Sequence, residues 1–298
     1  MQKFAAQATI ARADFYESLC RMKTILSIQS QVVGARVGNS VAAFAIERLG
    51  VRVLQLPTTI LGRRPDHGEA GGGSLPPATM ASLFNGLAAD GGLGEIDAVI
   101  TGYLGDSDQA PVILDAVDRI KAANPRAVFV CDPVLGDDGK PFVTPPILDA
   151  VVNGLVPRAD WLAPNLFELG IITGRDIASL EQARDAARRI GKPILASSVR
   201  TATGIGVLFT APAGDWFCET ARLPRAPKGT GDLLTGLFVA RRILGQAPAV
   251  SLEAATGAVY DVIVRSLAVE SEDLLLPEAH DLLADPITWP TSRALERV

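Results

Sequence analysis

A glycine-rich segment directly before a predicted helix is the part of the sequence best suited to binding a phosphate. It reads Gly229-Thr230-Gly231-Asp232, and the apolar residues after it recur at helical spacing until Gly245. Backbone N–H groups at a helix N-terminus carry partial positive charge and bind anions, and glycine lets the anion approach closely. A simple turn with Asp232 as a helix cap is the alternative interpretation. The Walker pattern of a P-loop is absent from the chain.

Four other segments contain polar or glycine-rich turns, and each of them follows a predicted strand. Parallel strands of an open α/β sheet end at the same edge, and ligands bind at that edge. We therefore expect these turns to lie together and to form one ligand site. The segments are residues 27–33 with 38–40, 101–105, 131–137 and 163–169.

Short apolar runs alternate with helical segments from Met22 onward. Continuous apolar runs of this length suit strands that are buried on both faces of a parallel sheet. Asn39 or Ser40 is suited to cap the first helix, and Gly50 to end it. The pattern predicts an α/β fold with a doubly wound, mostly parallel sheet flanked by helices. The expected strands are residues 23–28, 51–56, 98–100, 127–131 and 193–196, and the expected helices are 39–49, 110–124 and 180–191.

Two regions depart from this regular alternation. Residues 62–77 are rich in glycine and proline and are predicted to form a short lid loop. The segment after Glu272 is expected to be helical with proline interruptions. No break in composition marks a second domain, so residues 22–298 are expected to form a single domain. Residues 1–21 lack a secretory signal and are expected to be an N-terminal extension without fixed structure, with a functional helix as the alternative.

The composition narrows the classes of function. The 298 residues are 48% hydrophobic and 20% charged, as in a globular protein with a large core. A formal net charge of -5 argues against nucleic acid as a partner. The sequence contains no run of about 18 apolar residues, so no membrane span is expected. Cys20, Cys131 and Cys218 show neither zinc spacing nor a disulfide pattern, which suits a reducing cytoplasm.

Taken together, the motifs resemble the ribokinase-like superfamily and, within it, the pyridoxal kinases. The resemblance covers the chain from Met22 to about Ser266. It implies a ribokinase-like fold and ATP-dependent phosphorylation of the 5′-hydroxymethyl group of pyridoxal, and of pyridoxine and pyridoxamine, in vitamin B6 salvage. The motifs that carry it are, in order, Ser27-Ile28-Gln29-Ser30, Gly38-Asn39-Ser40, Gly102-Tyr103, Asp132-Pro133-Val134-Leu135-Gly136, Pro164-Asn165-x-x-Glu168 and Gly229-Thr230-Gly231-Asp232.

The resemblance implies catalytic and metal-binding roles for the residues on the phosphate side. Asp232 corresponds to the base that takes the proton from the acceptor hydroxyl. Gly229, Thr230 and Gly231 correspond to the anion hole that steadies charge on the transferring phosphoryl group. Asp132 and Glu168 correspond to carboxylates around Mg²⁺, acting partly through water. For the two acidic residues, a turn former and a solvated helix residue are the alternatives.

The resemblance also implies the residues that contact the nucleotide and the acceptor. Asn165 corresponds to a contact with the phosphates or with the metal's ligands, and Ser197 to a turn that touches the nucleotide. Ser30 corresponds to the residue that hydrogen-bonds the pyridine ring, and Tyr103 to a wall of the acceptor pocket. Ordinary turn or wall positions are the alternatives for these residues.

The chain departs from the pyridoxal kinase pattern on the acceptor side. It has Gln31 where the family usually has histidine, and Gly62-Arg63-Arg64-Pro65 in place of the family's lid segment. Pro65 offers no hydroxyl, so we expect His67 or Asp66 to make that contact; an exposed loop position is the alternative for His67. The phosphate side matches the pattern, so the sequence supports kinase chemistry more firmly than the identity of the acceptor.

The resemblance implies ATP as phosphoryl donor, Mg²⁺ as cofactor and a B6 vitamer as acceptor. It also implies a homodimer in the cytoplasm and allows a monovalent cation. One alternative is a kinase for hydroxymethylpyrimidine or another small alcohol on the same fold. A second alternative is a non-catalytic binder of pyridoxal 5′-phosphate, against which the presence of Asp232 argues, since a binder needs no base.

Overall fold

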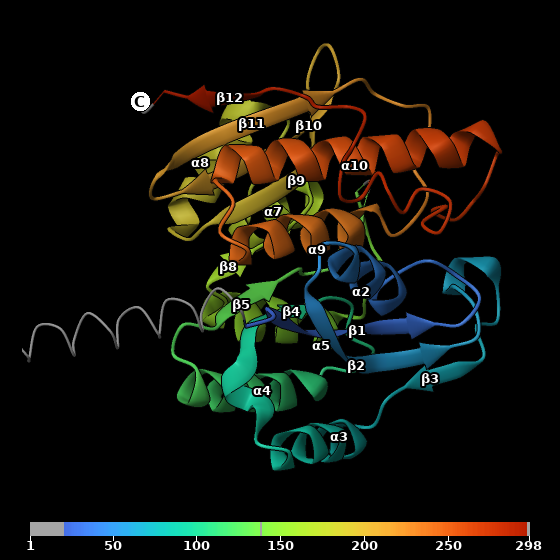
Figure 1. Ribbon diagram of the computed structural model, residues 1–298, viewed down its shortest axis with the longest axis vertical. Coiled ribbons are helices and arrows are strands. Elements are labelled where there is room, and N and C mark those ends of the chain that lie inside the picture. The colour runs from blue at the N-terminus through green and yellow to red at the C-terminus, as the bar shows by residue number, and fades with distance from the viewer. Residues whose placement is uncertain (1–20, 138, 297–298) are drawn as a thin grey trace, which may run out of the picture.

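The computed structural model describes residues 21–137 and 139–296. The predicted N-terminal extension, residues 1–21, lies outside this part of the chain except for Arg21. Within the described residues, ten strands form one sheet in the order β12-β11-β10-β9-β8-β5-β4-β1-β2-β3 (Figure 1). These strands are β1 (Thr24–Val32), β2 (Arg52–Leu61), β3 (Gly72–Ser74), β4 (Ile96–Thr101), β5 (Val128–Cys131), β8 (Trp161–Leu162), β9 (Ile194–Arg200), β10 (Ile205–Ala211), β11 (Gly214–Thr220) and β12 (Ser292–Leu295).

The centre of the sheet is parallel and its two margins are antiparallel. β1 pairs in parallel with β2 and β4, and parallel pairing continues through β5 and β8 to β9. β10, β11 and β12 extend one side in antiparallel pairs, and β3 pairs antiparallel with β2 on the other side. The predicted mostly parallel sheet is confirmed, and the five expected strands are present as β1, β2, β4, β5 and β9. The antiparallel strands β10 and β11 were not predicted.

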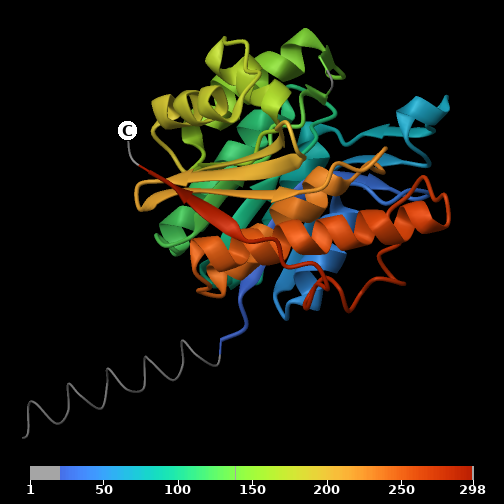
Figure 2. The ribbon, with the colours of Figure 1, turned by 90° about the horizontal axis from the view of Figure 1, so that it is seen from above.

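Helices cover both faces of the sheet and give the molecule three layers (Figure 2). One face carries α2 (Asn39–Arg48), α9 (Thr230–Ile243) and α10 (Pro248–Ala268). The other face carries α3 (Pro77–Ala89), α4 (Gln109–Ala123), α5 (Pro145–Asp149), η3 (Ala150–Leu155), α6 (Val156–Arg158), α7 (Leu166–Thr173) and α8 (Leu180–Ile190). Among the described helices, none has both the length and the apolar character that a bilayer span requires. The small hairpin of β6 (Gly136–Asp137) and β7 (Lys140–Pro141) and the short helix η2 (Gly92–Glu95) complete the described elements.

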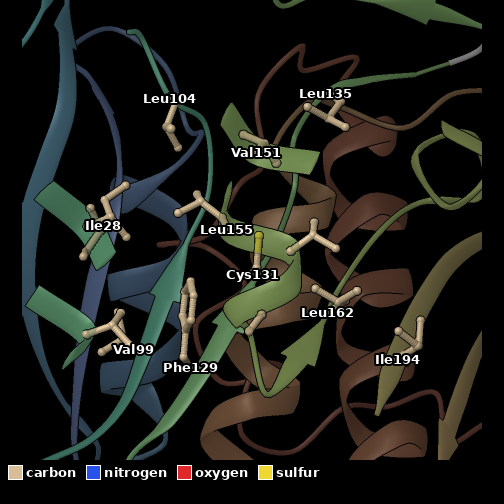
Figure 3. Packing of buried hydrophobic residues seen from close by; sticks show 14 of the residues in the cluster. Ile28, Val99, Leu104, Phe129, Cys131, Leu135, Val151, Leu155, Leu162 and Ile194 are labelled. Carbon is tan, nitrogen blue, oxygen red and sulfur yellow. The ribbon is translucent and has the colours of Figure 1, made fainter. Parts of the chain in front are cut away.

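The central strands are apolar throughout because each of their faces packs against helices. Phe129 belongs to the core that α4 and α8 cover, while its neighbour Val130 belongs to the core that α2 and α9 cover. Figure 3 shows Ile28 and Val99 beside Phe129 on neighbouring strands, with Leu155 of η3 in the same core. Burying one such side chain stabilises a fold by about 1.5–3 kcal/mol. Packing on both faces therefore fixes the positions of the central strands. It also fixes the edge of the sheet where the turns that follow these strands lie.

The region predicted to be a lid loop is a β-hairpin. β2 continues to Leu61 and pairs antiparallel with β3, and the short helix η1 (Pro65–His67) forms the tip. Gly72 has φ 79°, and a Cβ atom there would lie 2.1 Å from the Ile60 carbonyl oxygen, so the returning strand requires glycine. A glycine-rich strand with little side-chain pattern resembles a loop in sequence, which is why the pairing was missed.

The prediction of a helical segment after Glu272 was wrong. The chain between α10 and β12 follows turns, and β12 then joins the sheet beside β11. Side chains of the preceding helices hold this segment in place. The Arg241 guanidinium donates to the carbonyls of Leu283 and Ala284, each at 2.9 Å, and Asp261 accepts from the backbone at the end of the same segment. Its conformation thus depends on tertiary contacts that the local sequence does not reveal.

Candidate active site

The carboxyl ends of four neighbouring strands carry the predicted motifs. β8, β5, β4 and β1 are adjacent and parallel, so the turns that follow them open at the same edge of the sheet. Backbone hydrogen bonds beyond the strand ends join each turn to the next, which brings the motifs together as expected. These bonds run from Gly102 N to Ile28 O (3.0 Å), from Asp132 N to Thr101 O (3.0 Å), from Ala163 N to Cys131 O (2.9 Å) and from Ser197 N to Pro164 O (3.0 Å).

Helix α9 begins within the glycine-rich motif. Gly229 has φ 93°, and a Cβ atom there would lie 2.4 Å from the Arg36 carbonyl oxygen, so this position requires glycine. The first hydrogen bond of the helix is donated by Leu233 N–H to the Gly229 carbonyl. The N–H groups of residues 230–232 therefore have no helical partner and carry the partial positive charge of the helix start. A Cβ atom on Gly231 would meet nothing within 4 Å, so an anion has room to approach.

The Asp232 carboxylate lies where two helix N-termini meet. Its Oδ2 accepts a 2.8 Å hydrogen bond from the N–H of Gly38, the residue that precedes α2. The side chain keeps partial exposure, but the surrounding protein removes most of its hydration. Burial raises the pKa of Asp232 to about 6, and the hydrogen bond from Gly38 opposes part of that rise. A carboxylate with this pKa is ionised at neutral pH and can still accept a proton in a reaction.

Asp132 is a buried carboxyl group at this edge. It is 7% exposed, and the Thr235 hydroxyl donates a 2.8 Å hydrogen bond to its Oδ2. Burial raises the pKa of Asp132 well above its ordinary value, and the negative charges of Glu168 and Asp232 raise it further. Thr235 was not among the predicted site residues. Its position one helical turn after Asp232 places both side chains on one face of α9, and this spacing was the available signal.

Glu168 is held by backbone N–H groups at the start of α7. It forms a capping box with Asn165: Glu168 Oε2 accepts from Asn165 N at 2.9 Å, and Asn165 Oδ1 accepts from Glu168 N at 2.9 Å. Glu168 Oε1 accepts from Leu135 N at 2.7 Å and from Gly136 N at 3.3 Å. Burial raises the pKa of Glu168 to about 7, although these N–H donors favour the ionised form.

The turn after β5 is shaped to meet the Glu168 carboxylate. Val134 has φ 44°, a left-handed conformation that is costly for a β-branched residue. The strained backbone directs the N–H groups of Leu135 and Gly136 toward the same carboxylate oxygen, as in a backbone nest. Glu168 therefore joins this turn to α7, a structural role that sequence reasoning missed. Any cation beside it has to share oxygens that already accept from the backbone.

Asn165 and Ser197 lie side by side at the sheet edge. Their backbones form a parallel bridge, and the next residue, Ser198, has φ 61°. The Asn165 side chain is engaged within the protein, because its Nδ2 donates a 2.7 Å hydrogen bond to the Gly136 carbonyl. Asn165 thus fixes the turn after β5 to the turn after β8, in addition to capping α7.

Asp132 and Glu168 are the carboxylates at this edge that a divalent cation could use. In residues 21–137 and 139–296, no three His, Cys, Asp or Glu side chains are grouped so as to hold a metal ion by themselves. Mg²⁺ is commonly bound by one or two carboxylates together with phosphate oxygens and water. Asp132 is desolvated beside two other negative charges, and a cation would relieve that repulsion. The donor set fits Mg²⁺ that binds together with a nucleotide.

Ser30 and Tyr103, which were predicted to contact the acceptor, lie on neighbouring segments of this edge, in β1 and directly after β4. Ser30 is 7% exposed, and within the described part of the chain its hydroxyl makes no hydrogen bond, so it is available to a ligand. Tyr103 is half-buried, burial raises its pKa, and its carbonyl accepts a 2.6 Å hydrogen bond from the Thr58 hydroxyl. An open recess of about 380 Å³ is lined by the residues that follow Ser30 in the chain, 31–36, together with Ser40 and Asp273.

The tip of the lid hairpin is held against the segment that follows α10. Arg64 is 9% exposed, and its guanidinium makes two 3.0 Å hydrogen bonds to Asp66 and lies 3.6 Å from Asp273 Oδ1. His67 Nε2 lies 2.7 Å from Arg64 Nη2 and 3.6 Å from Glu272 Oε2. The structure therefore places His67 and Asp66 in contacts that position the lid. A direct contact between His67 and the acceptor stays a prediction.

Gln109 joins the base of the lid to the Tyr103 turn, and sequence reasoning missed it. It is fully buried at the start of α4, and its Oε1 accepts from Gly105 N at 3.1 Å. Its Nε2 donates to Thr58 O at 2.7 Å and to Leu75 O at 2.8 Å. A single glutamine carries no motif, so only the folded arrangement reveals this contact.

Comparisons with known proteins agree with this geometry. Residues 46–276 match the family model described as phosphomethylpyrimidine kinase. The chain is 37% identical over 277 residues to pyridoxal kinase PdxY of Pseudomonas putida (strain GB-1), covering 89% of this chain and 96% of that protein. It is also 37% identical over 271 residues to pyridoxal kinase PdxY of Leifsonia xyli subsp. xyli, covering 88% of this chain and 96% of that protein.

Solved structures show the same fold. The pyridoxal kinase from Leishmania donovani in complex with ADP and pyridoxamine has a TM-score of 0.86 and 25% sequence identity, covering 92% of this chain and 100% of that one. The pyridoxal kinase from Entamoeba histolytica has a TM-score of 0.85 and 23% identity over the same shares of the two chains. By sequence and by fold, the chain belongs to the pyridoxal kinase family.

Proposed function

We propose that this enzyme transfers the γ-phosphoryl group of ATP to the 5′-hydroxymethyl group of pyridoxal, and also accepts pyridoxine and pyridoxamine. The observation that carries the proposal is Asp232, whose burial raises its pKa to about 6, beside the open N-terminus of α9. The named activity of the relatives supports the same reaction. The product would be pyridoxal 5′-phosphate, so the biological role is B6 salvage.

Asp232 acts as the base in this mechanism. The acceptor hydroxyl binds against its free oxygen, and the carboxylate takes the hydroxyl proton while the hydroxyl oxygen attacks the γ-phosphorus. The bond between the γ-phosphorus and the β,γ-bridging oxygen breaks in the same step, and ADP leaves. The hydrogen bond from Gly38 holds the other oxygen, so the carboxylate keeps one orientation. General base catalysis of this kind contributes about 10²–10⁴-fold to a rate.

The start of α9 acts as the anion hole. The N–H groups of Thr230 and Gly231 are without helical partners, and a Cβ atom added to Gly231 would meet nothing within 4 Å. Donors fixed in this way stabilise negative charge on the transferring phosphoryl group without reorganising during the reaction. Gly229 makes the arrangement feasible, because its left-handed backbone lets the helix begin against the Arg36 carbonyl.

Asp132 and Glu168 are the residues that we propose to hold Mg²⁺, with Glu168 acting through water. The ion would supply positive charge that neutralises the triphosphate. Thr235 orients the Asp132 carboxylate through its hydrogen bond. Asn165 and Ser197 lie on the same stretch of sheet edge and would contact the nucleotide phosphates.

Ser30 and Tyr103 would bind the acceptor ring, the serine by a hydrogen bond and the tyrosine as a wall of the pocket. His67 would contact the acceptor from the tip of the lid hairpin, where Arg64 and Glu272 hold its ring. We further propose that residues 22–298 form one catalytic domain, and that the enzyme is a cytoplasmic homodimer. A monovalent cation near the nucleotide is part of the same proposal and rests only on the resemblance.

Hydroxymethylpyrimidine is the second candidate acceptor, because the matching family model describes phosphomethylpyrimidine kinase. A coupled assay for ADP formation, with Mg²⁺ and one acceptor at a time, tests both candidates. We expect turnover with pyridoxal, and a clear preference for hydroxymethylpyrimidine would overturn the acceptor assignment. Tight binding of pyridoxal 5′-phosphate without ATP turnover would instead favour a non-catalytic binder.

A further inference from the structure

A buried polar network lies behind the acceptor side of the site. Asn39 is fully buried, its Oδ1 accepts a 2.7 Å hydrogen bond from the Ser27 hydroxyl, and its Nδ2 donates to the Gln29 carbonyl at 3.1 Å. Gln29 Nε2 donates to Ser27 Oγ at 2.9 Å, which closes the network. The three side chains tie the first residue of α2 to the middle of β1.

This arrangement corrects the prediction that Asn39 or Ser40 caps helix α2. The residue before the helix is Gly38, and no side chain caps the first turn. The Asn39 amide points back to β1, whose Ser27 and Gln29 occupy buried positions where apolar side chains would ordinarily pack. Burying this many polar groups costs desolvation that only complete hydrogen bonding offsets, and such networks fix one geometry.

The geometry that the network fixes is that of the Gly38 peptide. Gly38 has φ 58° and ψ -133°, and a Cβ atom there would lie 2.3 Å from Ser30 O and 2.5 Å from Ser30 Oγ. An antiparallel bridge also pairs Gly38 with Gln31. The Gly38 N–H is thereby aimed at Asp232 Oδ2, 2.8 Å away. Asn39 directly follows Gly38 in the chain, and the hydrogen bonds of its side chain to Ser27 and Gln29 anchor Gly38 to β1.

We propose that Asn39 is a positioning residue for phosphoryl transfer, which orients the Asp232 carboxylate through the Gly38 N–H. The inference rests on the proposed function, in which Asp232 is the base. Ser27 and Gln29 serve Asn39 and have no contact with the acceptor in this scheme. The network therefore links the interior of the sheet to the orientation of the base across the α2–α9 contact, which Figure 1 shows beside β1.

The test compares Asn39→Ala and Ser27→Ala with the matched control Asn124→Ala. Asn124 is also a buried asparagine that donates to a strand carbonyl, Ile96 O at 2.8 Å, but it lies at the opposite end of β4 from the site. We expect kcat with pyridoxal to fall about 10–100-fold in the two network variants, because a base displaced by about 1 Å loses that much rate. The dissociation constant for MgATP should stay within about twofold of the wild type, and Asn124→Ala should leave kcat unchanged.

The decisive measurement is the same substitution in an Asp232→Asn background. If Asn39 acts through Asp232, then Asn39→Ala should cost less than about threefold once the base is gone, because residues that act as a unit are not additive. An undiminished loss in that background would overturn the positioning role. If Asn39→Ala does not fold, Ser27→Ala decides the question by the same comparison. Undiminished turnover of Asp232→Asn alone would instead overturn the proposed function, so the two failures are distinguishable.

Discussion

Replacing Asp232 with asparagine should inactivate the enzyme and stabilise its fold at the same time. Asparagine keeps the shape and can still accept the hydrogen bond from Gly38, but it has no basic oxygen for the acceptor proton. Turnover with pyridoxal should fall about 10²–10⁴-fold, while MgATP binding changes little. The stability gain follows from the cost of keeping the native carboxylate ionised in a desolvated site.

The shift in the pKa of Asp232 sets the size of this gain in the free energy of unfolding. Each pKa unit corresponds to about 1.4 kcal/mol, so raising the pKa of Asp232 from 3.8 to about 6 costs the folded state up to about 3 kcal/mol near pH 8. Because the side chain is partly exposed, solvent screening reduces this, and we expect about 1–2 kcal/mol. Asp232→Asn should therefore unfold a few degrees above the wild type near pH 8.

The sign of the effect can be checked by lowering the pH. The pKa of Asp232 is higher in the folded protein, so the native state binds the proton first; the penalty is fully present above about pH 6 and shrinks as the pH falls toward 3.8. Between about pH 6 and 3.8 the carboxyl becomes protonated in both states, and the stability difference should disappear. Thermal unfolding across this pH range measures the stability difference between Asp232→Asn and the wild type. The control is Asp90→Asn, a substitution at an exposed position, which should leave the unfolding temperature nearly unchanged. An Asp232→Asn variant that is active, or less stable near pH 8, refutes the reasoning.

Three further outcomes are expected from the site. Because the pKa of Asp232 is raised to about 6 and the base must be ionised, kcat/KM for pyridoxal should fall about tenfold per pH unit below that value, and a flat profile down to about pH 5 would contradict the assignment. Thr235→Val removes the hydroxyl that orients Asp132 and should raise the Mg²⁺ concentration for half-maximal turnover about tenfold; an unchanged Mg²⁺ titration would argue against a metal role for Asp132. Asp273→Asn weakens the lid contact with Arg64 and should raise KM for pyridoxal about threefold at low salt but not KM for ATP, whereas equal effects on both substrates would show that the lid contact is merely structural.

The sequence predicted the parts of the fold that depend on local pattern. Continuous apolar runs became strands such as β4 and β5, and the polar turns after them met at one sheet edge because parallel neighbours end together. Gly229 and Gly50 were correctly placed at helix boundaries, and both have positive φ. The same local logic located Asp232 in the first turn of α9.

The features that sequence reasoning missed depend on partners far away in the chain. Asparagine commonly caps the N-terminus of a helix, but the Asn39 side-chain amide hydrogen-bonds to Ser27 and Gln29 instead, so the side chain turns into the core. Glu168 was predicted to face a metal, and its oxygens also hold the turn at Leu135. Gln109 became identifiable only when β2, β3 and the Tyr103 turn were in place. Hydrogen bonds between distant segments leave no periodic signal in the sequence.

The direct test of the account is identification of the product formed from ATP and pyridoxal by the full chain with Mg²⁺. Mass spectrometry of the reaction mixture should show pyridoxal 5′-phosphate and an equal amount of ADP. Asp232→Asn protein purified in the same way should form both products about 10²–10⁴-fold more slowly. ADP formed without the phosphate ester, or the ester formed equally by the variant, would contradict phosphoryl transfer to the 5′-hydroxymethyl group with Asp232 as the base.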